Sequence, residues 1–289
     1  MTTEFNVRLT DTRESMLAEP VKIGRRGTAA WFMFTVVLAG VLLLCCIGTS
    51  QAATPQEREI LFQVSTIDAL LKGGYDGAVS MGELKKHGDL GIGTLDGLDG
   101  ELIVVDGQAY QITIDGIAHA VPDAAKTPFV ALTFFEPDMT LVFENVSGLD
   151  DLSRRIAAAL PASQAFYAIR VEQTFDAVTA RSVPRQSKPY PPLAEAVKQQ
   201  AVFAFRDAAG VMAGLFCPGY VGTANVPGLH LHFLTADKTR GGHVLNLQAA
   251  KLTVTLDRTD RLDLLIPEGL LPAGNSAAST PDALNSIER

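Results

Sequence analysis

Strand-like segments make up most of this chain, and they place the strongest limit on its fold. Apolar or alternating runs typical of strands occur at 59–65, 100–106, 108–114, 127–137, 138–148, 165–186, 210–219, 228–237, 243–257 and 262–267. Helix-like segments at 66–71, 149–161 and 280–289 interrupt them without regular alternation. The pattern therefore predicts an α+β fold of two mixed or antiparallel β-sheet subdomains with a few packed helices, and disfavours a doubly wound sheet.

The first 52 residues are expected to lie outside the folded domain. A polar segment (1–21) and three basic residues precede an apolar run at 29–48, and Ser50 and Ala52 follow it. A basic, then apolar, then small-residue order predicts a secretory signal, and therefore an exported protein, periplasmic or secreted. The apolar run is also long enough to cross a bilayer, so an uncleaved membrane anchor is the alternative.

Residues 53–289 are expected to form the folded domain, with a possible division into 53–148 and 149–289. The net charge of −8 argues against a nucleic-acid-binding protein, which needs a basic face. Beyond the leader, Cys217 is the only cysteine. We therefore expect no intramolecular disulfide, and we interpret Cys217 as a small buried apolar residue.

Three of the five histidines lie in one short stretch, "HLHFLTADKTRGGH", at residues 230–243. Alternate residues of a strand share a face, so His230 and His232 point the same way, about 6 to 7 Å apart. The "KTRGG" turn places His243 on the return strand beside them. Two interpretations stay open: ordinary cross-strand packing, or three neutral imidazoles that hold one metal ion and leave a fourth position open, as in catalytic zinc sites. The other two histidines are interpreted as structural or surface residues.

Two further features carry candidate charged groups. The Gly/Asp-rich segment at 87–107 lacks the lysine of a P-loop, precedes strands and does not match EF-hand spacing. We interpret it as a tight turn that places Glu101 at the start of an apolar strand, as either an edge residue or a buried acid suited to proton transfer. Arg181 ends an alternating strand before a Pro-rich segment, where it either faces solvent or grips a carboxylate.

Taken together, these motifs resemble the acetolactate decarboxylase family, from about Phe62 to the C-terminus. The resemblance is carried by "STIDALLKGGYDG", "HGDLGIGTLDGLDGELIVVDGQAYQ", "TPFVALTFF", "ARSVPRQSKPYPPL" and "GLHLHFLTADKTRGGHVL". It implies a zinc-dependent enzyme that removes CO2 from 2-acetolactate to give acetoin, and a homodimer. The leader would place this chain among the exported members.

The resemblance also implies the site. The residues are His230, His232 and His243 as zinc ligands, Glu101, Arg181 and Glu288 as catalytic residues, and Thr94 as a residue of the substrate pocket. The second glutamate of the family lies in a C-terminal tail, so Glu288 is preferred to Glu268.

These residues suggest a mechanism that needs no organic cofactor. Zn²⁺ would chelate the keto and hydroxyl oxygens of (S)-2-acetolactate and stabilise the enediolate left by loss of CO2. Arg181 would orient the leaving carboxylate or pair with the enediolate, and Glu101 would protonate it to give (R)-acetoin. The alternatives are a non-catalytic periplasmic zinc-binding protein, and a lyase for a larger 2-hydroxy-3-keto acid.

Overall fold

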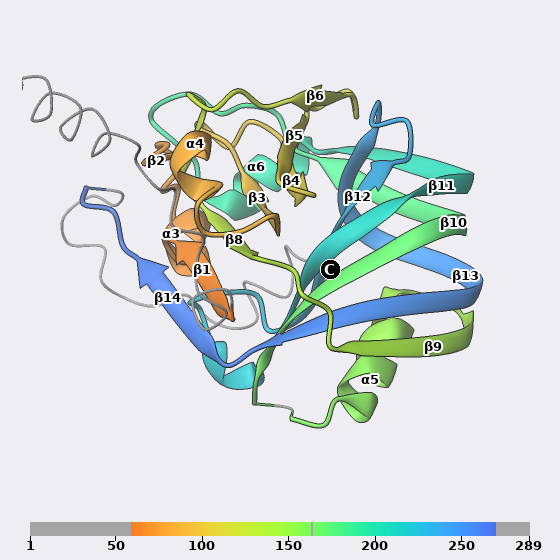
Figure 1. The fold of residues 1–289 in the computed structure, drawn as a ribbon. Coiled ribbons are helices and arrows are strands. Elements are labelled where there is room, and N and C mark those ends of the chain that lie inside the picture. Colours follow the sequence, from red (N-terminus) through yellow and green to blue (C-terminus); the bar gives the residue numbers. More distant parts are fainter. Residues whose placement is uncertain (1–58, 163, 270–289) are drawn as a thin grey trace, which may run out of the picture. The chain divides into compact units, whose positions relative to one another are not determined.

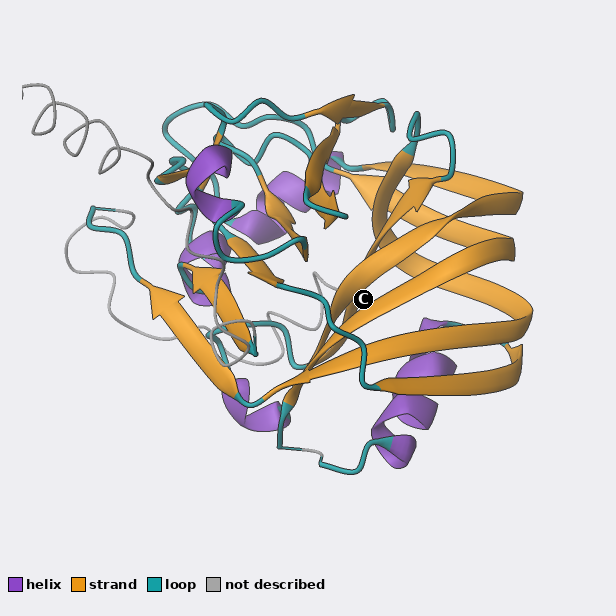
Figure 2. Ribbon diagram, in the orientation of Figure 1, coloured by secondary structure: helices purple, strands orange, loops and turns teal. Residues whose placement is uncertain are grey.

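The computed structural model describes residues 59–162 and 164–269, which Figure 1 draws in colour. The leader at 1–52, the helix expected at 280–289 and Glu288 lie outside the described residues. Within the described part, strands predominate and helices are few and short, as Figure 2 shows. The expected α+β fold is confirmed.

The first sheet is mixed and has seven strands in the order β14-β1-β8-β3-β4-β5-β6. Its strands are β1 (Ile60–Val64), β3 (Leu90–Thr94), β4 (Glu101–Val105), β5 (Gln108–Ile112), β6 (Ala118–Ala120), β8 (Val130–Thr133) and β14 (Arg261–Leu265). Only β14 runs parallel to its neighbour, β1; the other pairs are antiparallel. Asp106 and Gly107 form the turn between β4 and β5, and both have positive φ, as the two central residues of a type I′ hairpin turn require.

The second sheet contains the long strands that lie side by side on the right of Figure 1. They are β9 (Met139–Val146), β10 (Phe166–Ser182), β11 (Ala201–Cys217), β12 (Gly228–Thr235) and β13 (Gly241–Thr259), and every pair is antiparallel. The order is β10-β11-β12-β13-β9, and β10 also pairs with β13. This extra pairing closes β10, β11, β12 and β13 into a ring, which leaves β9 on the outer edge of β13.

Within the described ranges the helices are α3 (Ile67–Leu71), α4 (Met81–Leu84), α5 (Leu149–Ala159) and α6 (Leu193–Ala196), with 3₁₀ turns η1 (Val197–Gln199) and η2 (Gly219–Val221). The Thr66 hydroxyl caps α3 by accepting from the Ala69 N–H, and Asp150 and Asp151 lie in the first turn of α5, where the helix dipole favours acids. A small ladder joins β2 (Val79–Ser80) to β7 (Lys126–Thr127).

The two sheets do not correspond to the ranges 53–148 and 149–289. Strand β9 precedes residue 148 yet belongs to the second sheet, and β14 follows it yet belongs to the first. The chain therefore passes from the first sheet to the second between β8 and β9, and returns to the first sheet between β13 and β14. A division at one point in the sequence cannot separate two sheets that exchange strands in this way.

Two strands differ from the sequence expectation. Residues 90–94, interpreted as part of a turn, form the buried strand β3, and residues 201–217 form one continuous strand, β11. Glycine disfavours strands in general, which hid β3. Here Gly91 and Gly93 are required because a Cβ at either position would collide with β8, the neighbouring strand.

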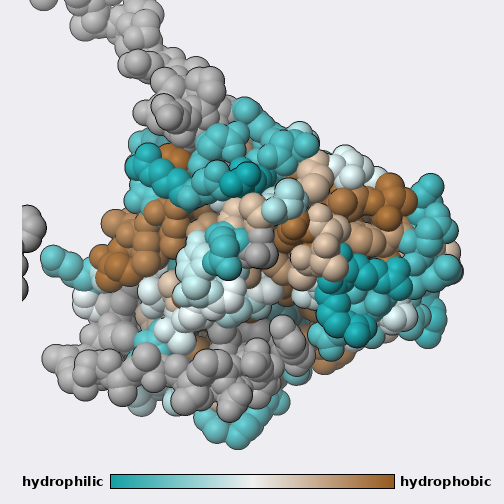
Figure 3. All heavy atoms as spheres, turned by 90° about the horizontal axis from the view of Figure 1, so that it is seen from below, coloured by the Kyte–Doolittle hydropathy of each residue, from teal (hydrophilic) through white to brown (hydrophobic). Residues whose placement is uncertain are grey.

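Apolar side chains fill both the ring and the space against the first sheet. One buried cluster lines the second sheet and α5, and another joins residues of the first sheet to β10, β11 and β12. Large apolar side chains on the surface, such as Val142 and Ile266, are few; Figure 3 shows one face, with apolar areas separated by polar ones. No helix among the described residues is long and apolar enough to cross a membrane.

Candidate metal centre

The three histidines lie on one face of the second sheet because of strand register. His232 on β12 is directly opposite His243 on β13, and His243 is directly opposite Arg181 on β10. Residues opposite each other in an antiparallel pair point to the same face. His232, His243 and Arg181 therefore form a row across the three strands. His230 precedes His232 by two residues and joins the same face.

A bulge in β13 lies just beyond this row. Thr179 pairs with Asn246 and Ala180 with Val244, so Leu245 is an extra residue on the β13 side. Bulges bend a strand and re-aim the side chains around them. Here His243 and Val244 are both buried, His243 in the pocket and Val244 in the core of the ring.

The three imidazoles are close enough to share one ion. Their candidate ligand atoms all lie within 4.8 Å of one another, and Nε2 of His230 is 3.1 Å from Nδ1 of His243. Two nitrogens bound tetrahedrally to one zinc at 2.0–2.1 Å are about 3.3 Å apart. The residues present therefore fit a divalent metal ion with only small adjustments of the rings.

The protonation of the rings also suits a metal. Burial, followed by the charge of Arg181, lowers the pKa of His230 to about 3, and burial lowers the pKa of His232 well below its usual value. Nδ1 of His232 lies 2.8 Å from the Leu102 carbonyl, which can only accept, so Nδ1 carries the hydrogen and Nε2 keeps its lone pair. Neutral imidazole is the form that binds metal.

No thiolate from the described part of the chain belongs to this centre. Cys217 is buried, as expected from the sequence, and burial raises its pKa to about 12. It packs among the apolar residues between the sheets and does not line the pocket of the histidines. Among the described residues, the three imidazoles are therefore the candidate metal ligands, and one carboxyl group lies beside them.

Glu101 is that carboxyl group, and the β3–β4 turn positions it. It is the first residue of β4, pairs with Thr94 at the end of β3, and is only 8% exposed. Its Oε2 lies 3.6 Å from Nε2 of His232, the nitrogen with the lone pair. Of the two sequence interpretations, the buried position is therefore the observed one.

The turn that delivers Glu101 is held from within. Thr94 donates its hydroxyl hydrogen to the Gly100 carbonyl at 2.7 Å, and Leu98 and Gly100 have positive φ. Thr94 itself lines the pocket, beside Glu101. This hydrogen bond closes the six-residue span between the two strands and so sets the place of the carboxylate.

Arg181 contributes a buried positive charge. Its side chain is 5% exposed, and Nη1 donates to Oε1 of Gln200 at 3.1 Å. No carboxylate among the described residues lies within ion-pair distance of it. Buried guanidinium groups are normally paired with an anion, because desolvation of an unpaired charge is costly. Of the two positions considered from the sequence, the solvent-facing one is therefore not observed.

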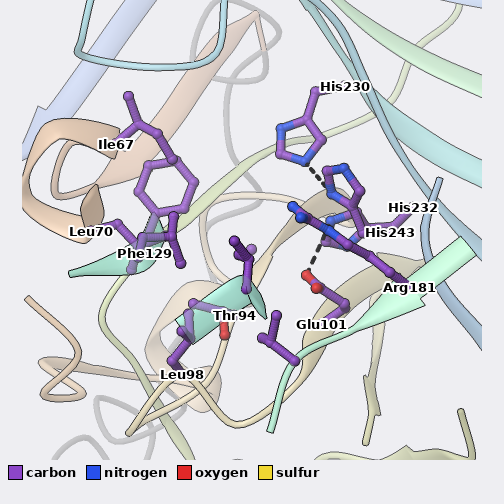
Figure 4. A pocket seen from close by; sticks show the side chains of 14 residues that line it. Ile67, Leu70, Thr94, Leu98, Glu101, Phe129, Arg181, His230, His232 and His243 are labelled. Carbon is purple, nitrogen blue, oxygen red and sulfur yellow. Dashed lines mark hydrogen bonds and ion pairs between the residues drawn. The ribbon is translucent and has the colours of Figure 1, made fainter. Parts of the chain in front are cut away.

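An apolar wall faces these polar groups across a cavity of about 40 Å³. Figure 4 shows Ile67, Leu70 and Phe129 on the side opposite the histidines, Glu101 and Arg181. The further apolar lining residues are Leu98, Val183, Leu193 and Val197. The sequence interpretation did not identify this wall, because its residues come from separate turns and short helices and share no periodicity.

Among the described residues, Glu268, His87 and His119 do not line the pocket. Glu268 is exposed in the turn after β14 and does not line the pocket, and Glu288 lies outside the described residues. His87 stacks on Phe62 with ring centroids 3.9 Å apart, and His119 is exposed on β6. Both of these histidines thus have the structural or surface positions expected for them.

Known proteins match most of the chain. The family profile described as alpha-acetolactate decarboxylase matches residues 61–270. Curated relatives with that name include one from Methanosarcina mazei, 48% identical over 72% of this chain and 73% of its own, and one from Brevibacillus brevis, 40% identical over 75% and 76%. The crystal structure of alpha-acetolactate decarboxylase from Bacillus subtilis strain 168 superposes with a TM-score of 0.73 at 39% identity, covering 79% of this chain and 97% of its own.

Proposed function

This chain belongs to the alpha-acetolactate decarboxylase family, and from that membership we propose that it is a zinc-dependent carboxy-lyase that converts (S)-2-acetolactate to (R)-acetoin and CO2. One observation carries the proposal: three buried imidazoles, a buried carboxyl group and a buried guanidinium converge on one pocket. Each group matches a requirement of this reaction.

His230, His232 and His243 would hold the metal. Three imidazoles without a thiolate suit zinc in a catalytic setting, where a fourth position stays available to substrate. When bound, Zn²⁺ supplies Lewis acidity at the keto oxygen, where negative charge develops as CO2 leaves. The Leu102 carbonyl fixes the tautomer and the ring orientation of His232.

Glu101 would hold and deliver the proton. After CO2 leaves, the carbon that carried it must gain one proton. Oε2 of Glu101 lies 3.6 Å from Nε2 of His232, the nitrogen that would face the metal. A carboxylic acid held on one face of the substrate delivers its proton to that face only, which would set the configuration of acetoin.

Arg181 would bind the substrate carboxylate. It provides a fork of N–H donors and a charge that no described carboxylate neutralises. The apolar wall opposite would contact the two methyl groups of acetolactate and exclude water from the reacting carbon. Thr94 would complete the lining between these two sides.

Other parts of the proposal rest on the sequence alone. Glu288 as a second site glutamate and export through the N-terminal segment both concern residues outside the described ranges. Homodimer formation is likewise an expectation from the family.

Turnover of racemic 2-acetolactate by the purified chain tests the proposal. We expect release of CO2 and formation of a single enantiomer of acetoin, loss of both after chelation, and recovery with Zn²⁺. A protein that binds zinc but releases no CO2 would be the non-catalytic alternative. Faster turnover of 2-aceto-2-hydroxybutyrate than of acetolactate would favour the lyase for a larger acid.

A further inference from the structure

Gln200 accepts a hydrogen bond from the guanidinium group of Arg181. Its Oε1 accepts from Nη1 of Arg181 at 3.1 Å, and this is the only hydrogen bond of that side chain within the part of the chain that the structure describes. Nε of Arg181 is buried and makes no hydrogen bond there. A long side chain with several rotatable bonds is therefore held by one neutral acceptor.

The chemistry of that acceptor is informative. Buried arginines are usually fixed by a carboxylate, which orients the fork but also cancels its charge. An amide oxygen orients the fork and leaves the positive charge available to a ligand. The one acid of the same segment, Glu195, is occupied on the surface by Lys198, with oxygen–nitrogen distances of 2.8 Å.

The backbone of Gln200 is fixed at both sides. Its N–H donates to the Val197 carbonyl at 3.1 Å, which closes the η1 turn, and the next residue, Ala201, begins β11 by pairing with Ser182 of β10. Val197 and Leu193, in the same short segment, line the apolar wall of the pocket. One segment thus sets both the wall and the orientation of the charged group opposite it.

From this geometry we propose that Gln200 is a positioning residue: it orients Arg181 toward the substrate carboxylate without itself neutralising the guanidinium charge. The inference rests on the proposed function, because it takes the anion to be the carboxylate of a 2-hydroxy-3-keto acid. Gln200 itself does not line the cavity, so it would act on substrate only through Arg181.

Two substitutions in the full-length chain separate orientation from charge. Gln200→Met keeps the length of the side chain but removes the acceptor, and the KM for acetolactate should rise by roughly 10- to 100-fold, the usual range for a lost hydrogen bond to a charged group. The loss should appear in KM, with kcat within about threefold of wild type, because the carboxylate charge is present in bound substrate and disappears as CO2 leaves.

Gln200→Glu keeps the acceptor and the shape but adds a negative charge beside Arg181. The two would form an ion pair, so KM should rise further than in Gln200→Met although the fold is intact by thermal unfolding. A merely structural hydrogen bond predicts the opposite order, with Gln200→Glu close to wild type. Gln199→Met and Gln199→Glu, at the exposed neighbouring position, are the matched controls and should change KM by less than about twofold.

A binding measurement makes the test independent of turnover. An analogue whose ketone is reduced to an alcohol keeps the carboxylate but cannot lose CO2. Calorimetry should show its affinity for Gln200→Met reduced by the same factor as KM, whereas acetoin, which lacks the carboxylate, should bind as it does to wild type. Equal weakening of both ligands, or a Gln200→Glu enzyme with wild-type KM, would overturn the role of Gln200. A wild-type chain that leaves acetolactate unchanged would instead overturn the proposed function.

Discussion

Asp257 is a buried acid that the proposed chemistry does not use, and its ionisation should limit the stability of the fold. It lies on β13 with 1% exposure; Oδ2 accepts from the Glu136 N–H at 3.0 Å, and Oδ1 has no hydrogen-bond partner among the described residues. Burial, together with the nearby charges of Glu59, Asp138 and Glu136, raises the pKa of Asp257 from 3.8 to about 7. The folded state therefore binds a proton that the unfolded state has already released between these two values.

The sign and size follow from proton linkage. The folded-state pKa is the higher one, so the contribution of Asp257 to the free energy of unfolding is most favourable below pH 3.8 and falls as the pH rises toward about 7. With these two pKa values, Asp257 lowers the free energy of unfolding, relative to its value below pH 3.8, by about 2 kcal/mol at pH 5 and about 4 kcal/mol at pH 8. Asn cannot ionise, so the stability of Asp257→Asn relative to wild type should shift by about 2 to 3 kcal/mol in favour of the variant between pH 5 and pH 8.

Urea unfolding followed by far-UV circular dichroism at the two pH values measures this shift. The unsatisfied N–H groups of the new amide change the free energy of unfolding by the same amount at both pH values. This change therefore cancels when the effect of the substitution at pH 5 is subtracted from that at pH 8. Asp263→Asn, at an exposed position of β14, controls for the loss of one carboxylate. If Asp257→Asn differs from wild type by the same amount at pH 5 and pH 8, Asp257 ionises in the fold without penalty and the reasoning from burial is refuted.

Three further predictions concern the pocket. Glu101→Gln should lower kcat by roughly 10²- to 10⁴-fold while the zinc content stays unchanged. Glu268→Gln, at an exposed glutamate, is the control and should leave kcat unaltered. A Glu101→Gln enzyme with near-normal turnover would exclude Glu101 as the acid. Arg181→Lys keeps the charge but loses the planar fork, so kcat/KM should fall by roughly 10- to 100-fold; a value near wild type would mean that a point charge is sufficient. Leu193→Ala enlarges the apolar wall and should raise the kcat/KM ratio of 2-aceto-2-hydroxybutyrate to acetolactate by about tenfold, measured in competition; an unchanged ratio would show that this wall does not contact the additional methylene.

The histidine cluster was accessible from the sequence because its geometry is local. The two-residue period of a strand places His230 and His232 on one face, and the short turn before His243 fixes which strand returns beside them. The structure adds the register, with His232 opposite His243, and the tautomer of His232 set by Leu102. The latter depends on β4, more than a hundred residues earlier, so no local pattern could have supplied it.

The parts that sequence reasoning missed depend on contacts between distant segments. Strand β3 contains two glycines because its backbone lies close to β8. Glycine has a low strand propensity, so the sequence of this segment predicts a turn. The place of β14 in the first sheet follows from its parallel pairing with β1, some two hundred residues away in the chain. The contact between Gln200 and Arg181 similarly requires the η1 turn to lie beside the end of β10.

Metal content is the most direct test of the central claim, which is that three imidazoles from the β12–β13 hairpin hold the catalytic ion. Elemental analysis of the purified protein should give about one zinc per chain for wild type and for His119→Ala, an exposed histidine, and well below that for His232→Ala, with decarboxylation lost in parallel. Stoichiometric zinc in His232→Ala, or full acetolactate turnover by a metal-stripped wild type, would contradict the account.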